Sequence, residues 1–299
     1  MDEFDLIIEE TNLSAITKLK NEIETKKIIY HLHYEGETTK YNDESFGNLL
    51  AISQYVGENW SNKTGRDKNT IHILKNCIDV NKFIKQLEVD EYKRLRLQYS
   101  INDDQIVAIY VGRIIEEKGV LEMLNALENV NDSSLVLLLV GSANFAEKTL
   151  TAYEKKVTER INEMKTRVIQ VGYIKNEELY KYYGISDFAI VPSIWNEPAG
   201  LVVLEAEASG LPVIASNVGG IPEFFCEEAG ILVERDSYFE QNLAAAINKM
   251  TENKSELKAM GKKARMFAYQ YNSEEYYNTF SYIINSIMEN GINDKASCN

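Results

Sequence analysis

Four charged residues have the types and spacing to bind a diphosphate and the hydroxyl groups of a sugar. Arg113 and Lys118 follow the apolar run Ile106–Val111, and seven residues separate Glu197 from Glu205. Arginine and lysine pair with phosphate oxygens, whereas ionised carboxylates only accept hydrogen bonds and therefore suit hydroxyl donors. Together these residues predict a site for an anionic small molecule that is rich in hydroxyl groups.

The spacing of the two carboxylates predicts how they share one helix. Pro198 is favourable as a first helical residue, so we expect a helix over 199–209 with Glu197 at its entrance. Eight residues at about 100° each leave Glu205 about 80° beyond two full turns, on nearly the same face. One carboxylate is then expected at the mouth of a cleft and the other deeper.

Each cation also has a simpler explanation. Arg113 could form a surface salt bridge with Glu116 or Glu117, and Lys118 could lie at a solvated helix start. The coincidence of five suitable loops weighs against both explanations, because the loops bring glycines, cations and two helix starts to one edge of a predicted sheet.

A regular alternation of short apolar runs and amphipathic stretches positions these residues. Runs that are apolar on both faces are typical of strands buried in a parallel sheet, and strand–helix alternation predicts a doubly wound α/β fold. The predicted strands are Ile106–Val111, Leu135–Val140, Arg167–Val171, Phe188–Val191, Pro212–Ala215 and Ile231–Val233. The predicted helices between them are 119–129, 149–165, 176–184 and 199–209.

Ligands of such sheets bind beyond the carboxyl ends of the strands. Glycines that permit a close backbone approach follow three strands, at Gly112, Gly141 and Gly172, and PSIWNEPAG and SNVGGIPE open helices after two others. Helix N-termini attract anions. We therefore predict a diphosphate cradle at this edge.

The chain divides into three predicted parts. Residues 84–270 form the α/β domain, with a charged first helix at about 84–99. Residues 1–80 form a partial second α/β domain, and the boundary is expected at Asn76–Phe83. Residues 271–299 hold one more helix and a tail. The other predicted elements are strands Leu6–Ile8, Lys27–Tyr30, Leu49–Ile52 and Ile71–Leu74, and helices 12–25, Asp236–Met250, Ser255–Tyr271 and Glu274–Glu289.

Composition excludes several classes of protein. The 299 residues include 32 Lys and Arg against 46 Asp and Glu, a formal net charge of −14, which disfavours nucleic acid as a partner. Cys77, Cys226 and Cys298 lie far apart, which predicts free thiols and no metal site. The start has no signal-peptide pattern, and the longest apolar run is far shorter than the ~18 residues of a membrane span. We expect a cytoplasmic protein.

The sequence over roughly 105–225 resembles the C-terminal domain of the retaining, GT-B-fold glycosyltransferases of family 4 (glycosyl transferases group 1). The resemblance rests on VGRIIEEKG and on VGYIKNEELYKYYGISDFAIVPSIWNEPAGLVVLEAEASGLPVIASNVGGIPE, which contain the E-x7-E pair and the GG-x-x-E run. It implies an α/β, GT-B-type fold with a complete C-terminal Rossmann-like domain and a partial N-terminal one.

The resemblance also implies roles for individual residues. Arg113 and Lys118 bind the diphosphate of a nucleotide-sugar, Glu205 holds the ribose hydroxyls, and Glu197 contacts the donor sugar near the reacting carbon. The backbone at Gly172, Tyr173 and Ile174 frames the base, and the amides of Ala199, Gly200 and Leu201 lie against the sugar or the distal phosphate. The other donor-binding positions are Gly112, Ser193, Gly219 and Gly220.

The N-terminal part resembles the second half of the family's N-terminal domain. The segment IIYHLH places His33 where the family has a donor-proximal histidine. His31 lies two residues away and points to the same face, so the choice between them stays open. The family's first strands have no counterpart, so we expect a truncated polypeptide, a homo-oligomer or partner chain that completes this domain, or a donor-binding remnant.

Two classes of function remain. The first is transfer of a hexose, with retention and without metal or cofactor, from a nucleotide-diphosphate sugar to a glycan, lipid-linked or protein acceptor. UDP is the expected nucleotide, with GDP and ADP as alternatives. The second is a non-catalytic glycosyltransferase-like subunit. An epimerase or phosphorylase of the same fold is a weaker third reading. Contact with the inner membrane face would need the 84–99 helix, whose cations Lys93, Arg94 and Arg96 are interpreted as solvated.

Overall fold

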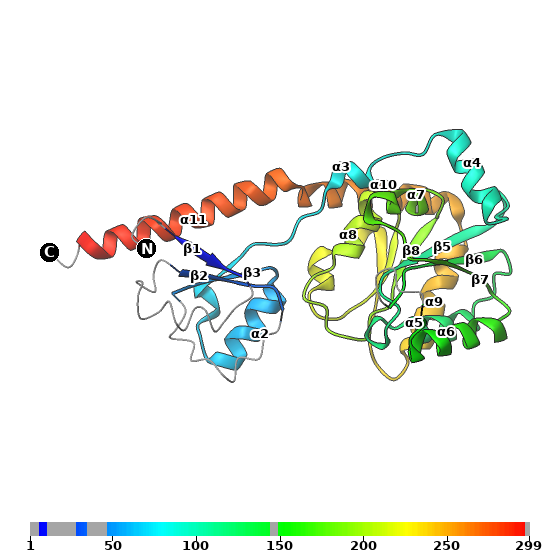
Figure 1. Cartoon of the computed structure of the whole chain (residues 1–299), viewed down its shortest axis with the longest axis horizontal. Coiled ribbons are helices and arrows are strands. Elements are labelled where there is room, and N and C mark those ends of the chain that lie inside the picture. Colours follow the sequence, from blue (N-terminus) through cyan, green and yellow to red (C-terminus); the bar gives the residue numbers. More distant parts are fainter. Residues whose placement is uncertain (1–5, 11–27, 35–46, 144–148, 297–299) are drawn as a thin grey trace. The chain divides into compact units, whose positions relative to one another are not determined.

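The computed structural model describes residues 6–10, 28–34, 47–143 and 149–296. The chain forms two compact units, one of Met1–Cys77 with Tyr271–Asn299 and one of Ile78–Gln270 (Figure 1). Each unit contains one parallel sheet. None of the helices described is both long and apolar enough to cross a bilayer. The predicted helix at 12–25 lies outside the described residues.

The larger unit is built on a six-stranded sheet in the order β10-β9-β8-β5-β6-β7. The central strand β5 is followed along the chain by β6 and β7 on one side, and then by β8 to β10 on the other. This reversal creates a topological switch point beside β5, where ligands of open α/β sheets bind. The strands are β5 Ile106–Val111, β6 Leu135–Val140, β7 Arg167–Gly172, β8 Phe188–Val191, β9 Val213–Ser216 and β10 Gly230–Val233.

The strands at the two ends of this sheet differ from the prediction. We expected every run to be buried on both faces, but β7 has no fully buried residue, and only Val233 of β10 is buried. An edge strand has a neighbour on one side only, and helices cover it less completely. The exposed side chain of Arg167 in β7 donates a hydrogen bond to the Ser100 carbonyl at 2.7 Å.

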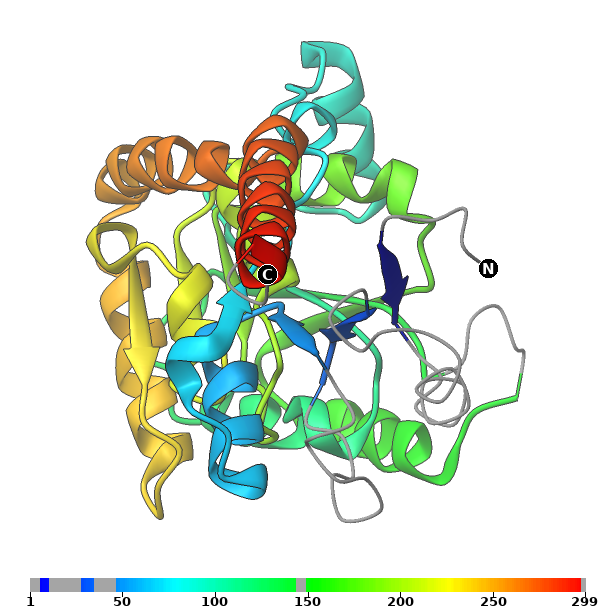
Figure 2. The same cartoon turned by 90° about the vertical axis from the view of Figure 1, so that its left-hand side faces the viewer.

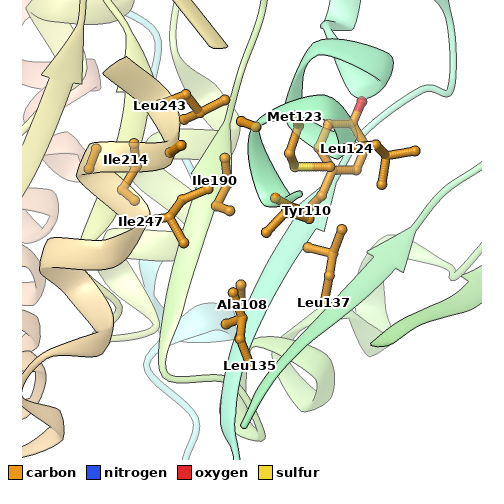
Figure 3. Packing of buried hydrophobic residues seen from close by; sticks show 14 of the residues in the cluster. Ala108, Tyr110, Met123, Leu124, Leu135, Leu137, Ile190, Ile214, Leu243 and Ile247 are labelled. Carbon is orange, nitrogen blue, oxygen red and sulfur yellow. The ribbon is translucent and has the colours of Figure 1, made fainter. Parts of the chain in front are cut away.

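Two helices, α5 (Val120–Leu127) and α9 (Phe239–Thr251), pack on one face of the sheet. Figure 3 shows Met123 and Leu124 of α5 and Leu243 and Ile247 of α9 around inward side chains of four strands. The core is continuous across the sheet because alternate residues of each strand point to this face. The strand residues labelled in the figure are Ala108, Tyr110, Leu135, Leu137, Ile190 and Ile214.

The remaining elements of this unit include the helices that flank the site. They are α3 Val80–Phe83, α4 Val89–Gln98, α6 Ala152–Glu163, α7 Leu179–Gly184, α8 Leu201–Ala208 and α10 Lys254–Ala268, with short 3₁₀ turns η5 Glu116–Lys118, η6 Asn176–Glu178, η7 Ile221–Phe224, η8 Glu227–Ala229 and η9 Tyr269–Tyr271. Helix α8 contacts α3 and α10.

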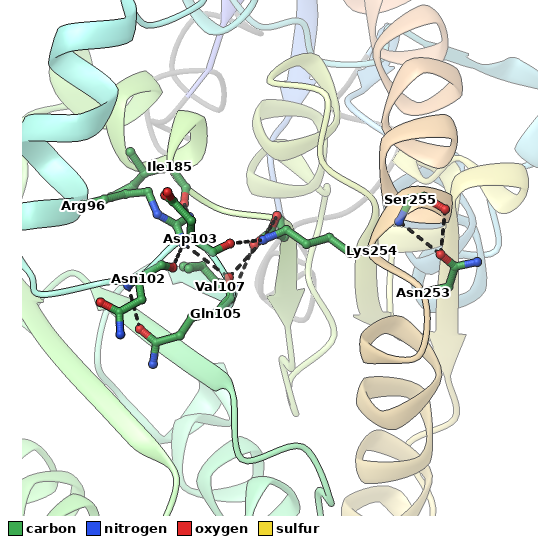
Figure 4. Close-up of polar contacts among 10 residues, drawn as sticks. Arg96, Asn102, Asp103, Gln105, Val107, Ile185, Asn253, Lys254 and Ser255 are labelled. Carbon is green, nitrogen blue, oxygen red and sulfur yellow. Dashed lines mark hydrogen bonds and ion pairs between the residues drawn. The ribbon is translucent and has the colours of Figure 1, made fainter.

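The charged helix predicted at 84–99 starts later, at Val89, and its cations are not all solvated. Arg96 is buried, with 3% of its surface exposed. Its guanidinium donates to the carbonyls of Ile185, Asn102 and Gln105 (Figure 4). Arg96 therefore attaches α4 to the sheet, so the interpretation of this side chain as solvated is wrong.

The smaller unit has a four-stranded parallel sheet in the order β1-β2-β3-β4. Helix α11 lies on one side of it and helix α2 on the other, as Figures 1 and 2 show. Ile283 and Ile287 of α11 pack on Ile29, Leu50 and Leu74. The elements are β1 Ile7–Glu9, β2 Ile28–Leu32, β3 Asn48–Ala51, β4 Ile71–Ile73, α2 Gln54–Thr64, η4 Lys68–Thr70 and α11 Ser273–Ala296.

Candidate functional site

A cavity of about 400 Å³ opens at the carboxyl edge of the larger sheet, beside the switch point. This volume lies within the usual range for small-molecule sites. Its wall includes backbone and side chains that follow β5, β6 and β7, together with the first turns of α8. The lining residues are Tyr110, Val111, Gly112, Arg113, Lys118, Val140, Gly141, Ser142, Ala143, Tyr173, Ile174, Asn176, Leu179, Val202 and Glu205.

Both predicted site cations, Arg113 and Lys118, line the cavity. Neither a surface salt bridge for Arg113 nor a solvated position for Lys118 fits the structure. Arg113 forms no ion pair with any described residue, including Glu116 and Glu117. Lys118 is only 23% exposed, and its Nζ lies 2.5 Å from Glu197 Oε1. The cavity therefore offers one unpaired guanidinium and one ammonium whose charge is shared with a carboxylate.

The carboxylate of Glu197 is held from two directions. Ser193 Oγ lies 2.7 Å from the same Oε1 atom that Lys118 contacts. The loop that carries both residues is fixed to the turn η5, because Ile194 N donates to the Glu117 carbonyl at 3.0 Å. Lys118 ends that turn, so backbone contacts bring the ammonium and the carboxylate together across 79 residues of sequence.

The predicted geometry of the Glu197–Glu205 pair is wrong. Helix α8 begins at Leu201, and Gly200 occupies its N-cap position, so Glu197 and Pro198 precede the helix and lie in an extended loop. The two carboxylates do not share a helix face. Their relation comes instead from tertiary contacts, with Glu205 in α8 and Glu197 beside Lys118.

Gly219 and Gly220, two predicted residues of the GG-x-x-E segment, contact the backbone of Glu197. Gly220 N donates to the Glu197 carbonyl at 2.6 Å. A Cβ atom at Gly219 would lie 2.3 Å from the same carbonyl oxygen, so the loop can approach this closely only with glycine there. The two glycines thus position the backbone of Glu197, and neither lines the cavity.

Glu205 lines the cavity from the second turn of α8. Tyr183 Oη donates to its Oε2 at 3.3 Å. Burial raises the pKa of this carboxyl to about 7, although the Tyr183 hydroxyl, Lys82 and the Asn176 side chain act in the opposite direction. Lys82 also contacts the Asn176 side chain. A carboxyl group with this pKa changes its charge within the physiological range.

For the nucleotide-sugar that the sequence resemblance implies, we expect binding to this cavity to strengthen as pH rises through about 7. Below that pH Glu205 is protonated and loses acceptor capacity toward hydroxyl groups. Above it, both carboxylate oxygens can accept hydrogen bonds from hydroxyl groups. We expect the affinity for UDP-glucose, which has no phosphate group that titrates near neutrality, to rise between pH 6 and pH 8. Calorimetry on the parent and on Glu205→Gln tests this, because the variant should bind more weakly and with a flatter pH dependence. An equal slope in both proteins would contradict it.

Gly141 allows two loops of the cavity wall to meet. Its φ is +135°, and a Cβ atom there would lie 1.8 Å from the Gly112 carbonyl oxygen. Gly141 N donates to the Gly172 carbonyl at 2.8 Å. Gly141 therefore contacts both the loop after β5 and the end of β7.

Gly141→Ala should lower the free energy of unfolding by about 2–4 kcal/mol, since it adds backbone strain and a clash between main chains. Gly172→Ala is the matched control: φ is +82° there, but no atom lies within 4 Å of the added Cβ, so about 1–2 kcal/mol is expected. Urea unfolding of both variants measures the difference. Equal losses would show that the close approach at Gly141 has no energetic weight.

The other predicted positions fall into four groups. Gly112, Tyr173 and Ile174 line the cavity. Gly172 lines a neighbouring hollow of about 250 Å³ that also includes Tyr173. Ala199, Gly200 and Leu201 lead into α8, which no described side chain caps at its N-terminus. His33 belongs to the other unit.

Sequence reasoning did not identify Asn176, Tyr183 or Ala143 as parts of the site. Asn176 starts the turn η6 after β7, and a polar residue at that position is a usable signal. Ala143 N donates to Glu154 Oε1 at 2.7 Å, and Tyr183 is fully buried beneath Glu205. Neither contact has a local sequence signature, because the partners meet only in the folded chain.

A model of the family described as glycosyl transferases group 1 matches residues 91–267, more than half of the chain. Lipopolysaccharide 1,2-N-acetylglucosaminetransferase of Salmonella typhimurium is 28% identical over 227 residues, which cover 74% of this chain and 57% of that protein. The spore coat protein SA of Bacillus subtilis is 24% identical over 275 residues, which cover 88% of this chain and 73% of that protein. The chain therefore spans little more than half the length of the first relative.

Two solved structures show the same fold. The Anabaena protein Alr3699/HepE in complex with UDP matches with a TM-score of 0.80 at 22% identity, over 95% of this chain and 79% of that one. A glycosyltransferase from Rickettsia africae ESF-5 matches with a TM-score of 0.83 at 20% identity, over 97% of this chain and 78% of that one. At these identities the likeness concerns the fold alone.

Proposed function

Because the chain belongs to the glycosyl transferases group 1 family, we propose that it transfers a hexose from a nucleotide-diphosphate sugar to a glycan, lipid-linked or protein acceptor. Retention of configuration, independence of metal and membership of family 4 are parts of this proposal. The observation that carries it is the cavity at the switch point, whose wall combines Arg113, Lys118 and Glu205.

The proposed chemistry follows from the charges around the cavity. Negative charge develops on the departing diphosphate as the bond to the sugar breaks. Arg113, Lys118 and the uncapped start of α8 are fixed positive groups that stabilise such charge. No proton has to move for this stabilisation, because a diphosphate is a good leaving group without protonation.

Glu197 has a different proposed role. Its Oε1 is shared between Lys118 and Ser193, so its position is fixed before any ligand binds. We assign it to the hydroxyls of the donor sugar, near the reacting carbon. Glu205, which lines the cavity, is assigned to the ribose hydroxyls. His33 remains the proposed second catalytic group, contributed by the smaller unit.

UDP-glucose is the first donor to test. Crystal structures of the Anabaena protein Alr3699/HepE hold UDP, UDP and glucose, or UDP-glucose. These ligands belong to that protein, and for this chain UDP is a proposal only. GDP and ADP are the alternative nucleotides.

A second candidate function is that of a non-catalytic subunit that binds a nucleotide-sugar. The spore coat protein SA of Bacillus subtilis matches a larger share of this chain than the other relative described above. Its name refers to a spore coat and not to a transferase. This candidate predicts nucleotide binding without turnover, so the two functions separate in one assay.

The assay is release of UDP from UDP-glucose, with and without a mixture of oligosaccharide acceptors. Without an acceptor we expect slow release of UDP, because water can take the place of the acceptor. With a suitable acceptor we expect faster release. Proton NMR of the released glucose should show the α anomer first if configuration is retained. Binding without release would favour the non-catalytic subunit, and initial β-glucose would contradict retention.

A further inference from the structure

Two histidines and a glutamate meet in the smaller unit. His31 is in β2 and His33 directly follows that strand. Side chains two residues apart along a strand point to one face, and the two imidazole rings have centroids 4.2 Å apart. Strand β1 pairs with β2 so that Glu9 lies opposite Tyr30. The next residue, Glu10, therefore lies beside His31.

His31 has an unmet bonding requirement. It is buried, with 4% of its surface exposed. Its Nδ1 lies 3.5 Å from Glu10 Oε1, while its Nε2 is buried and has no hydrogen-bond partner within the described part of the chain. A buried ring nitrogen without a partner is costly. Nε2 is thus the nitrogen left to bind a metal ion, and Nδ1 is the one that faces Glu10, so Glu10 has to rotate to reach the same ion.

We propose that Glu10, His31 and His33 bind one divalent transition-metal ion, with Zn²⁺ as the best match. One ligand atom from each residue lies within 4.8 Å of the other two. Zinc sites hold ligand atoms about 3.4 Å apart, as bond lengths of about 2.1 Å and tetrahedral angles require. The exposed side chain of Glu10, at 60%, can rotate to close this difference.

The donor set fits this class of ion and no other common one. Imidazole nitrogens favour zinc, copper or nickel, whereas calcium and magnesium prefer oxygen ligands. Three protein ligands would leave one coordination position open.

Metal binding here is independent of the proposed transfer reaction, since it needs only the smaller unit. One consequence does rest on the proposed function: an ion bound by His33 would withdraw that imidazole from the donor sugar. Occupancy of the site would then turn transfer off.

The test is a titration of the EDTA-treated, dialysed full chain with ZnCl₂, in competition with a chromophoric chelator. We expect one tightly bound ion per chain, and at least about tenfold weaker binding in His33→Ala and in Glu10→Gln. Both side chains are partly or largely exposed, so the variants should fold, and circular dichroism checks this. His72→Ala is the matched control, because His72 is the third of the three histidines in the sequence.

A second measurement excludes a thiol site. Co²⁺ should give visible absorption without a thiolate charge-transfer band, and Cys77→Ser should bind Zn²⁺ as the parent does. Equal Zn²⁺ affinity in the parent and in His33→Ala would overturn the proposal. Loss of binding in Cys77→Ser or His72→Ala, with His33→Ala unaffected, would overturn it as well.

Discussion

Replacing Glu197 with glutamine should reduce turnover by roughly 10²–10³-fold while nucleotide affinity changes by less than about threefold. The Glu197 carboxylate lies 2.5 Å from Lys118 Nζ and 2.7 Å from Ser193 Oγ. The amide keeps the shape and an acceptor for Ser193, but it loses the charge. A fixed charge near the reacting carbon acts mainly in the transition state, so its loss appears in kcat and little in binding.

The control for this variant is Glu117→Gln. Glu117 is exposed, and it supports the Glu197 loop through its backbone carbonyl, which accepts from Ile194 N and Trp195 N. Removing its side-chain charge should therefore leave turnover and affinity unchanged. Steady-state kinetics with UDP-glucose and calorimetry with UDP give both quantities. If Glu197→Gln lost affinity and turnover equally, Glu197 would be a binding residue and its assignment to the sugar would fail.

Arg113→Ala should weaken UDP binding by about 1–3 kcal/mol, which is roughly 5–150-fold. Arg113 lines the cavity and has no ion pair with the described residues, so its removal should cost the fold little. Binding should also become less sensitive to salt, because one charged contact is gone. Calorimetry at two salt concentrations measures both effects.

Arg94→Ala is the matched control for this prediction. Arg94 is 73% exposed on α4, where it lies 3.5 Å from Glu91, and no Arg94 atom lines the cavity. It has the same charge and loses the same number of atoms, so it reports any effect of net charge alone. Equal weakening in the two variants would show that Arg113 acts through long-range charge and not as a ligand of the diphosphate.

The strands were predictable because burial on both faces leaves a strong local signal. The runs Ile106–Val111, Leu135–Val140 and Phe188–Val191 have the predicted bounds. The prediction of an α/β fold of GT-B type is confirmed by the two parallel sheets and by the structural neighbours. The loops that follow the strands then fix where a ligand can bind, which is why several cavity residues could be named from the sequence.

Helix α2 shows what periodicity alone misses. No helix was expected at Gln54–Thr64. Its few buried residues are Val56, Gly57 and Trp60, which form too narrow an apolar stripe to stand out in the sequence. The usable signals were at its ends. Ser53 Oγ caps the helix by accepting from Val56 N at 3.1 Å, and Gly65 ends it in a left-handed conformation. Capping residues therefore carry information that apolar spacing does not.

The contacts that organise the site could not be derived from local sequence. Lys118 and Glu197 are 79 residues apart. From the sequence alone, each of the two side chains could equally have been solvated. Pro198 suggested a helix start, but Pro alone does not fix one, and α8 begins three residues later. Arg96 similarly looked solvated within its own helix, and only the folded chain shows the carbonyls that bind it.

The most direct test of the account is a calorimetric titration of the 299-residue chain with UDP, and then with GDP and ADP. We predict saturable binding of about one nucleotide per chain, weakened in Arg113→Ala and unchanged in Arg94→Ala. Such a result would establish the cavity at the switch point as a working donor site. If the folded chain bound none of the three nucleotides, or bound one equally well without Arg113, the central claim would be contradicted.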